Sequence, residues 1–360
     1  MERYWLGDRL PKDNNFDLIR LFAAVEVVVY HATHHLHATL PAWGDYALQQ
    51  FRGVPIFFFI SGLLVTSSLA GRGNVVKYFE RRARRVLPAL WVAGGLALVL
   101  LGAFGQLSDQ LSSPKFWLWL GSQLTVFQVY NPASFRDFGV GVVNGSLWTI
   151  PVEISFYLVL PAAVLLSSWS KQPRLTFIAM VLVAMAFSFV AYAFVVIEAG
   201  SLPARLVKIT LLPHLWLFAL GVLAFVYFGT LAAIVRWWPP LFPAIYLIYA
   251  FGLRPFLPEL VAELLGQGLL SMAVLAVAVA IPPISDRLLR GQDFSYGVYL
   301  FHMLVVNAAV ELGLGGVPTV LVVVAVTFAL AGLSWKYVEK PALAGSFMRT
   351  RVEAEIAGHN

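Results

Sequence analysis

Ten long apolar stretches, separated by short segments rich in Pro, Gly or charged residues, dominate this sequence of 360 residues. An apolar run of about 20 residues is long enough to cross a bilayer as a helix. The stretches are residues 16–36, 52–70, 86–106, 148–168, 175–197, 208–228, 238–253, 260–282, 294–312 and 318–335. The pattern predicts an all-α, polytopic transmembrane helix bundle of about ten spans.

The composition agrees with this prediction. Apolar residues make up 59% of the chain and charged residues 12%, with a mean hydropathy of +0.78, whereas roughly a quarter of a soluble domain is charged. A soluble protein is therefore excluded. The absence of Cys excludes disulfides, thiolate metal sites and a cysteine nucleophile. Stretch 16–36 is too long for a signal-peptide core and has no small-residue cleavage site after it, so we expect it to remain as the first helix.

The basic residues predict the orientation of the bundle. With ten spans both termini lie on one side, and that side receives most of the 25 Lys and Arg residues. Apart from Arg20 inside the first span, the opposite side holds only Arg52, Lys115, Arg136, Arg205, Lys208 and Arg254. This asymmetry predicts cytoplasmic termini and explains the net charge of +6 without nucleic acid. The apolar segment 116–130 is too short to span, and we expect it to be re-entrant or interfacial.

The first predicted helix carries ionisable residues at membrane depth, where each costs at least about 2.5–3.5 kcal/mol and needs a partner or a task. Arg20 and His31 are eleven residues apart, so they project from one face about 16 Å apart along the axis. Arg20 is placed to pair with Asp17 one turn away. His31 is either a neutral core histidine that donates to a backbone carbonyl or a base that titrates near neutrality. Glu26 lies on the opposite face and is left out of the site.

The spacing of His31 and His35 would also suit a metal ion, since residues four apart share a helical face. No acidic residue at a recognisable ligand spacing accompanies them, so we expect no metal site. A second candidate is Glu153, in the first turns of the span that follows Ser146 and Pro151. The helix dipole alone favours a carboxylate there. Alternatively, Glu153 orients the His31 imidazole and stabilises its cation.

A third candidate is the basic segment KYFERRARRVLP, residues 77–88. Such a segment is typically a topological anchor or a patch for anionic lipid. Its use of arginine rather than lysine also suits a bidentate grip on the phosphates of a nucleotide-bearing donor. Two further motifs, FSYGVYLFH at 294–302 and SWKYVEKP at 334–341, indicate interfacial aromatic anchors, and a lone His302 is more typical of a structural than of a catalytic role.

In order and spacing, six segments resemble the acyltransferase-3 family of membrane-bound O-acyltransferases, which modify O-antigens, exopolysaccharides and other surface glycans. They are FDLIRLFAAVEVVVYH, FFFISGLL, RRARRVLP, GSLWTIPVEISFYLVLP, FSYGVYLFH and WKYVEKP, between residues 16 and 341. The resemblance implies His31 and Glu153 as catalytic residues and Arg82, Arg85 and Arg20 as residues that bind the donor. Thr149, Ile154 and Lys340 depart mildly from the family pattern.

The resemblance further implies a single transmembrane domain over residues 1–345, a short cytoplasmic tail at 346–360, and no SGNH domain. The expected reaction moves an acyl group, usually acetyl from acetyl-CoA, to a hydroxyl of a surface or lipid-linked polysaccharide at the bacterial inner membrane. Glycan-synthesis proteins are expected partners. His31 acts either as a base or as an acylated relay. The alternatives are a glycan or organic-anion transporter that uses His31, Glu153 and Arg20 as a coupling relay, and a non-catalytic assembly factor.

Overall fold

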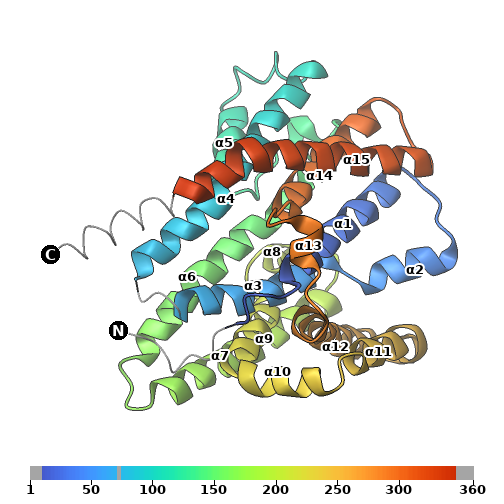
Figure 1. Ribbon diagram of the computed structural model, residues 1–360. Helices are drawn as coiled ribbons and strands as arrows, with labels where there is room; N and C mark the ends of the chain where they lie inside the picture. The colour runs from blue at the N-terminus through green and yellow to red at the C-terminus, as the bar shows by residue number, and fades with distance from the viewer. Residues whose placement is uncertain (1–9, 71–73, 346–360) are drawn as a thin grey trace. The chain divides into compact units, whose positions relative to one another are not determined.

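The computed structural model describes residues 10–70 and 74–345, and every regular element within these ranges is helical (Figure 1). The predicted tail at 346–360 lies outside the described residues. So do Arg3, Arg9 and Arg72, which are among the basic residues on the predicted cytoplasmic side. Contacts divide the chain into two compact units. Within the described residues, unit 1 comprises 10–26, 45–70, 74–75 and 149–291, and unit 2 comprises 27–44, 76–148 and 292–345. Helix α1, Phe16–His35, begins in unit 1 and ends in unit 2.

Unit 1 contains most of the helices. They are α2 (Ala42–Gln50), α3 (Gly53–Ala70), α6 (Thr149–Ser167), α7 (Pro173–Ile197), α8 (Leu202–Lys208), α9 (Leu215–Val226), α10 (Phe228–Trp237), α11 (Leu241–Ile248), η4 (Tyr249–Leu253), η5 (Arg254–Phe256), α12 (Glu259–Val279) and α13 (Ser285–Leu289). Unit 2 holds α4 (Val75–Ala103), α5 (Pro114–Leu124), η2 (Ala133–Phe135), η3 (Gly145–Trp148), α14 (Ser295–Glu311), α15 (Gly316–Ser334) and η6 (Trp335–Glu339).

Among the described residues, six helical segments are long and apolar enough to cross a membrane, or seven if the bent pair α9 and α10 counts as one span. The six are Ala42–Ala70, Val75–Ala103, Gly145–Ser167, Pro173–Ile197, Glu259–Val279 and Gly316–Gly345. The remaining predicted stretches coincide with helices that are more polar, bent or short: α1, α9, α11 and α14. The predicted all-helical fold is thus confirmed with six candidate membrane-spanning segments, while the count of ten spans and the orientation stay predictions.

Two glycines set the packing inside unit 1, where α3 crosses α9. A Cβ added at Gly62 would lie 2.0 Å from the carbonyl oxygen of Phe218, and one at Gly221 would lie 2.0 Å from that of Phe59. Small residues let helix backbones approach closely, which is how helices associate in lipid, where burial of apolar surface gives little drive. Phe156 of α6 then stacks on Phe218 with ring centroids 4.5 Å apart. The sequence of α3 and α9 therefore specifies a backbone-to-backbone contact.

Buried polar side chains fix the ends of α1 and α3 in unit 1. Asn15 is 2% exposed, and its amide nitrogen donates to the carbonyl of Val277 while its oxygen accepts the N–H of Ile284, so the start of α1 is bound to the end of α12. Glu26, for which the sequence offered no role, accepts the backbone N–H of Gly53 at 2.6 Å. Gly53 is the first residue of α3, so a carboxylate meets the positive end of that helix.

An aromatic core in unit 2 explains the short apolar segment 116–130. Its first part forms α5, which buries Phe116 and Trp119 against Phe135 and Phe138. The following loop is fixed to α14 by Asn307, whose amide donates to the carbonyls of Val142 and Val143. The first part of segment 116–130 is therefore a helix that packs within unit 2. Whether the segment is re-entrant or interfacial stays a prediction.

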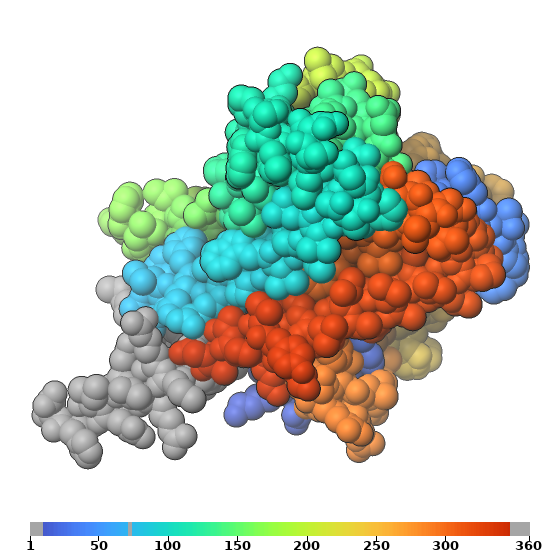
Figure 2. Space-filling view, turned by 90° about the horizontal axis from the view of Figure 1, so that it is seen from above, coloured from blue at the N-terminus to red at the C-terminus, as the bar shows by residue number. Residues whose placement is uncertain are grey.

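Helix α4 of unit 2 begins earlier than the predicted span. The span was expected from residue 86, but the helix starts at Val75, so the whole basic segment lies on its first turns and Pro88 lies inside it. Neighbouring segments make an internal proline tolerable in such helices. Arg84 donates to the carbonyl of Ala342, which joins α4 to the C-terminal end of the α15 segment. Figure 2 shows the cyan surface of α4 lying beside the red surface of that segment.

Candidate functional site

A pair of histidines forms the centre of the candidate site in unit 2. Nδ1 of His31, on α1, lies 2.9 Å from Nε2 of His302, on α14, and the two rings are parallel with centroids 5.1 Å apart. His302 is completely buried, whereas His31 is partly exposed. One imidazole is therefore held inside the unit, and the other presents its far edge to the surroundings.

The other hydrogen bond of His302 determines which nitrogen of each ring carries a proton. Nδ1 of His302 lies 2.6 Å from the backbone carbonyl oxygen of Tyr299, which can only accept. Nδ1 of His302 is therefore the donor, and in the neutral ring Nε2 is an acceptor. The proton between the rings then belongs to Nδ1 of His31, and a neutral His31 carries its lone pair on Nε2. The partner of His31 is thus a second histidine rather than the backbone carbonyl considered from the sequence.

Helix α14 is held at this position by the loop before α6. The amide of Asn144 donates to the carbonyl of Leu300 at 2.9 Å, and the hydroxyl of Tyr299 donates to the carbonyl of Ser146 at 3.1 Å. Both bonds are made by residues of α14 that lie two and three positions before His302 in the sequence. They restrict the rotation and translation of α14. They therefore hold the His302 imidazole in place, and that imidazole orients His31.

The basic segment forms a second cluster in unit 2. Nη2 of Arg85 lies 2.6 Å from Oδ2 of Asp293, and its guanidinium carbon lies 5.4 Å from the centre of the Tyr296 ring. Arg82 is half-buried one turn earlier on the same face of α4. Arg84 differs, because Glu80 and the carbonyl of Ala342 take its guanidinium.

One helix connects the arginines to the histidine pair. Tyr296 and His302 are six residues apart on α14, which is about 9 Å along the axis at 1.5 Å per residue. The contact partner of Arg85 and the contact partner of His31 therefore belong to the same short length of α14. Unit 2 brings together His31, Arg82 and Arg85 of the predicted site.

The remaining predicted residues, Arg20 and Glu153, belong to unit 1, and the positions of the two units relative to one another are not determined. Arg20 lies 3.8 Å from Asp17, which confirms the predicted ion pair. Glu153 accepts a hydrogen bond from the hydroxyl of Tyr157 one turn later on α6. The predicted orienting role of Glu153 stays a prediction, and the orienting contact that is observed comes from His302.

Comparison with known proteins decides the family. The sequence matches the acyltransferase-3 family, described as an acyltransferase domain, over residues 13–336. The chain belongs to the acyltransferase-3 family. This confirms the resemblance drawn from the six motifs, and the basic segment, Glu153 and the histidine pair all lie within the matched residues.

Similar proteins cover nearly the whole chain of this acyltransferase-3 protein. Nodulation protein 10 of Rhizobium leguminosarum bv. viciae is 33% identical over 348 residues, which cover 92% of this chain and 93% of that protein. An O-acetyl transferase of Shigella phage Sf6 is 27% identical over 92% of this chain and 96% of its own. The peptidoglycan O-acetyltransferase OatA of Listeria monocytogenes serovar 1/2a is 25% identical over 93% of this chain and 56% of its own. No solved structure matches the chain.

Sequence reasoning about this acyltransferase-3 protein found His31 but assigned His302 and Asp293 no part in the site. His302 was singled out within FSYGVYLFH and taken as structural because it stood alone. Nothing in the sequence pairs two residues that are 271 positions apart. A usable signal was present, because an imidazole in the middle of an apolar helix needs a polar partner.

The spacing of His31 and His35 on one helical face would also suit a metal ion. Within residues 10–70 and 74–345, no three His, Asp or Glu side chains come together as ligands. His31 and His35 stack with ring centroids 6.1 Å apart, but Nδ1 of His31 is already occupied by His302. The arrangement at His31 suits proton transfer at Nε2, which a metal ligand at that atom would block.

Proposed function

We propose that this protein is a membrane-bound O-acyltransferase that moves an acetyl group from acetyl-CoA to a hydroxyl of a surface or lipid-linked polysaccharide. The single observation that carries the proposal is the chain of contacts from Tyr299 O through His302 to His31. Membership of the acyltransferase-3 family and the similarity to named O-acetyltransferases support the reaction class. The apolar helices support a multi-pass protein, which we place in the bacterial inner membrane with cytoplasmic termini, residues 1–345 acting as one domain.

In the proposed mechanism His31 is the general base. The sugar hydroxyl attacks the thioester carbonyl carbon while its proton passes to Nε2 of His31. The C–S bond then breaks, the ester forms, and the proton moves from His31 to the sulfur of the departing CoA. As His31 becomes cationic, its Nδ1–H already points at Nε2 of His302, so no side chain has to turn. A general base of this kind contributes about 10²–10⁴-fold to the rate.

The arginines complete the donor site in this proposal. Arg82 and Arg85 bind the phosphates of acetyl-CoA, because a guanidinium presents a planar pair of donors that matches phosphate oxygens. The stem of the donor then runs toward His31, and Arg20 lies beside it on α1. Glu153 supports the charge on His31, as first expected from the sequence. Glycan-synthesis proteins are the proposed suppliers of the acceptor.

The experiment that tests the proposal measures transfer of label from radiolabelled acetyl-CoA to surface glycan in membranes. Wild type is compared with His31→Ala and with the matched control His34→Ala, because His34 lies on the same helix but is exposed. We expect label to be lost in His31→Ala and kept in His34→Ala at equal protein abundance. Undiminished label without His31 would sink the proposed mechanism and bring the transporter or assembly-factor alternative forward.

A further inference from the structure

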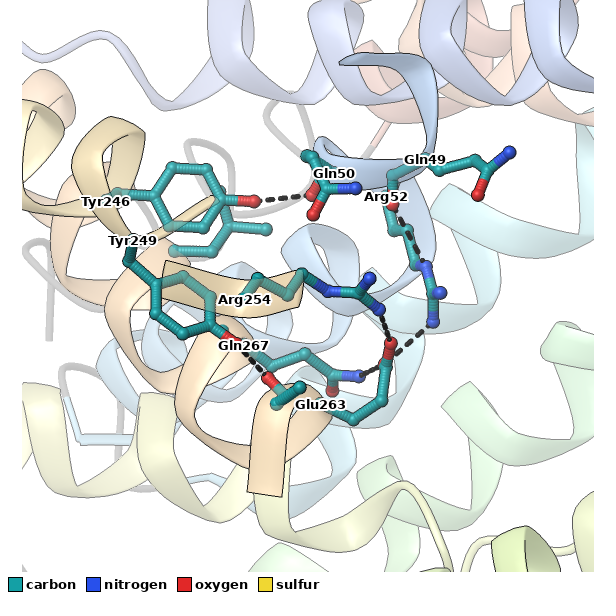
Figure 3. A pocket seen from close by; sticks show the side chains of 11 residues that line it. Gln49, Gln50, Arg52, Tyr246, Tyr249, Arg254, Glu263 and Gln267 are labelled. Carbon is teal, nitrogen blue, oxygen red and sulfur yellow. Dashed lines mark hydrogen bonds and ion pairs between the residues drawn. The ribbon is translucent and has the colours of Figure 1, made fainter. Parts of the chain in front are cut away.

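A buried charged cluster in unit 1 plays no part in the reaction proposed above. The carboxylate of Glu263 on α12, 7% exposed, accepts from Nη1 of Arg52 at 2.7 Å and from Nη2 of Arg254 at 2.5 Å. Gln267, one turn further along α12, donates to the same carboxylate at 3.1 Å. Figure 3 shows the two guanidinium groups converging on Glu263 from different segments, with Gln49 beside Arg52.

The cluster carries more positive charge than an internal ion pair needs. The residues that line this pocket include two arginines and one glutamate, which leaves one net positive charge. The space between them is only about 20 Å³, room for a single water. Arg52 is 45% exposed and Arg254 21% exposed, so an anion can reach the outer edges of both. Two guanidinium groups side by side suit a phosphate.

An apolar groove of about 500 Å³ adjoins the cluster. It is a groove, open on one side, between α1, α11, α12 and the start of α3, and its lining includes Phe51 and the exposed side chains of Phe22 and Leu247. Tyr246 and Leu270 line both this groove and the charged pocket, so the two are continuous. The volume of this groove lies in the range of ligand sites. An apolar lining of this kind favours a hydrocarbon chain as the ligand.

A single stripe of α12 passes from the cluster into the groove. Glu263, Gln267, Leu270, Val274 and Val277 recur at intervals of three and four residues, so they share one helical face. From Glu263 to Val277 this face measures about 21 Å at 1.5 Å per residue. Its first two residues are polar and the other three are apolar. The stripe therefore has the length and polarity of an amphiphile with one long chain.

We propose that unit 1 binds a lipid-linked saccharide here, with the hydrocarbon chain in the apolar groove and the phosphate on Arg52 and Arg254. This inference rests on the proposed function, since it names the acceptor as a saccharide that is still attached to its lipid. The exposed amide of Gln49, beside Arg52, is the nearest partner for a sugar hydroxyl at the outer edge of the cluster. An ordinary phospholipid shares the anionic head and the chain but does not carry the sugar.

The test is a binding measurement on the full-length protein in nanodiscs, without acetyl-CoA. The probe is a radiolabelled N-acetylglucosamine linked through diphosphate to a polyprenyl chain, and phosphatidylglycerol in large excess is the competitor. We expect the wild type to retain the probe against the competitor. Arg52→Gln and Arg254→Gln should each weaken binding by about tenfold or more, as expected for loss of a charge-assisted hydrogen bond to phosphate.

Two further variants guard against misfolding. Ala273→Trp fills the groove without touching the charged cluster and should weaken binding to a similar extent. Its matched control is Ala186→Trp on the exposed face of α7, and the control for charge is Arg205→Gln, an exposed arginine on α8 outside both pockets. Both controls should bind as the wild type does.

The outcomes separate this inference from the proposed function. Displacement of the probe by phosphatidylglycerol would identify an ordinary lipid site, and full binding in the arginine and Ala273→Trp variants would identify a structural ion cluster. Either result overturns the inference. Consumption of acetyl-CoA is assayed separately. If the wild type consumes acetyl-CoA but does not bind the probe, only this inference fails, whereas binding without any consumption overturns the proposed function instead.

Discussion

Nδ1 of His31 lies 2.9 Å from Nε2 of His302, and Nδ1 of His302 lies 2.6 Å from the carbonyl oxygen of Tyr299. In the familiar Ser-His-Asp arrangement a carboxylate orients the base. In the site proposed here the imidazole of His302 takes the place of that carboxylate, and a backbone carbonyl in turn orients His302. Such an arrangement fixes the tautomer of the base without placing a second full charge in the apolar part of the protein, where it would be costly.

The first prediction concerns His302. Replacement by Ala removes the acceptor of the His31 Nδ1–H, so the proton of a neutral His31 redistributes between its two nitrogens. We expect acetyl transfer to fall by about 100-fold or more. His302→Gln keeps an acceptor near the position of Nε2 and should retain clearly more activity than His302→Ala. The two rates and their pH profiles are compared in the same membranes; equal activity of both variants would contradict an orienting role.

The second prediction concerns donor affinity. Arg85→Lys keeps the charge but loses the planar fork, so we expect the KM for acetyl-CoA to rise by about tenfold with a smaller change in kcat. Arg84→Lys is the matched control, because Glu80 and the carbonyl of Ala342 take the Arg84 guanidinium. Steady-state kinetics with both variants measure the effect. An unchanged KM in both would show that the segment acts only through its total charge, and an equal rise in the two would contradict a specific role of the Arg85 guanidinium.

The third prediction concerns the contact of α3 with α9. Gly62→Ala places a methyl group against the carbonyl of Phe218, which is backbone and cannot turn aside, so the variant should lose about 1–3 kcal/mol of stability. Gly95 of α4 has nothing within 4 Å of an added Cβ. Gly95→Ala should be neutral or stabilising by up to about 1 kcal/mol, because alanine favours a helix interior. Thermal unfolding in detergent distinguishes the two, and similar melting temperatures would argue against close packing at Gly62.

The fourth prediction concerns Glu26. Glu26→Leu keeps the approximate volume but leaves the N–H of Gly53 without its acceptor, so we expect a loss of about 1–3 kcal/mol. Glu26→Gln keeps a side-chain carbonyl and should lose less. The same unfolding measurement ranks the variants. A Glu26→Leu variant as stable as the wild type would mean that water replaces the carboxylate at the start of α3.

The sequence predicted the helical character of this protein more fully than its site. Each of the ten apolar stretches contains a helix, because hydrophobicity over about 20 residues is a local property. The ion pair of Arg20 with Asp17 was equally predictable, since both lie within one turn. The basic segment was found from composition alone.

Long-range pairings were beyond prediction. The partners of His31 and of Glu26 lie on other helices, and a single sequence contains no information on which helix faces which. The same holds for Gly62 and Gly221, whose importance appears only once α3 and α9 cross. The charged cluster at Glu263 was also missed, because Arg52 and Arg254 were assigned to topology and Glu263 had no neighbour in sequence to suggest a network.

The carboxylate of Asp293 makes two contacts that bear on the release of the product. Its Oδ2 atom holds Arg85, and its Oδ1 atom accepts the backbone N–H of Ser295 at the start of α14. The guanidinium proposed to bind donor phosphate thus has an anion of its own while the donor is absent. Phosphate binding is then an exchange of one anion for another rather than the neutralisation of a bare charge. Such an exchange is readily reversed, so it favours departure of the spent carrier after each transfer.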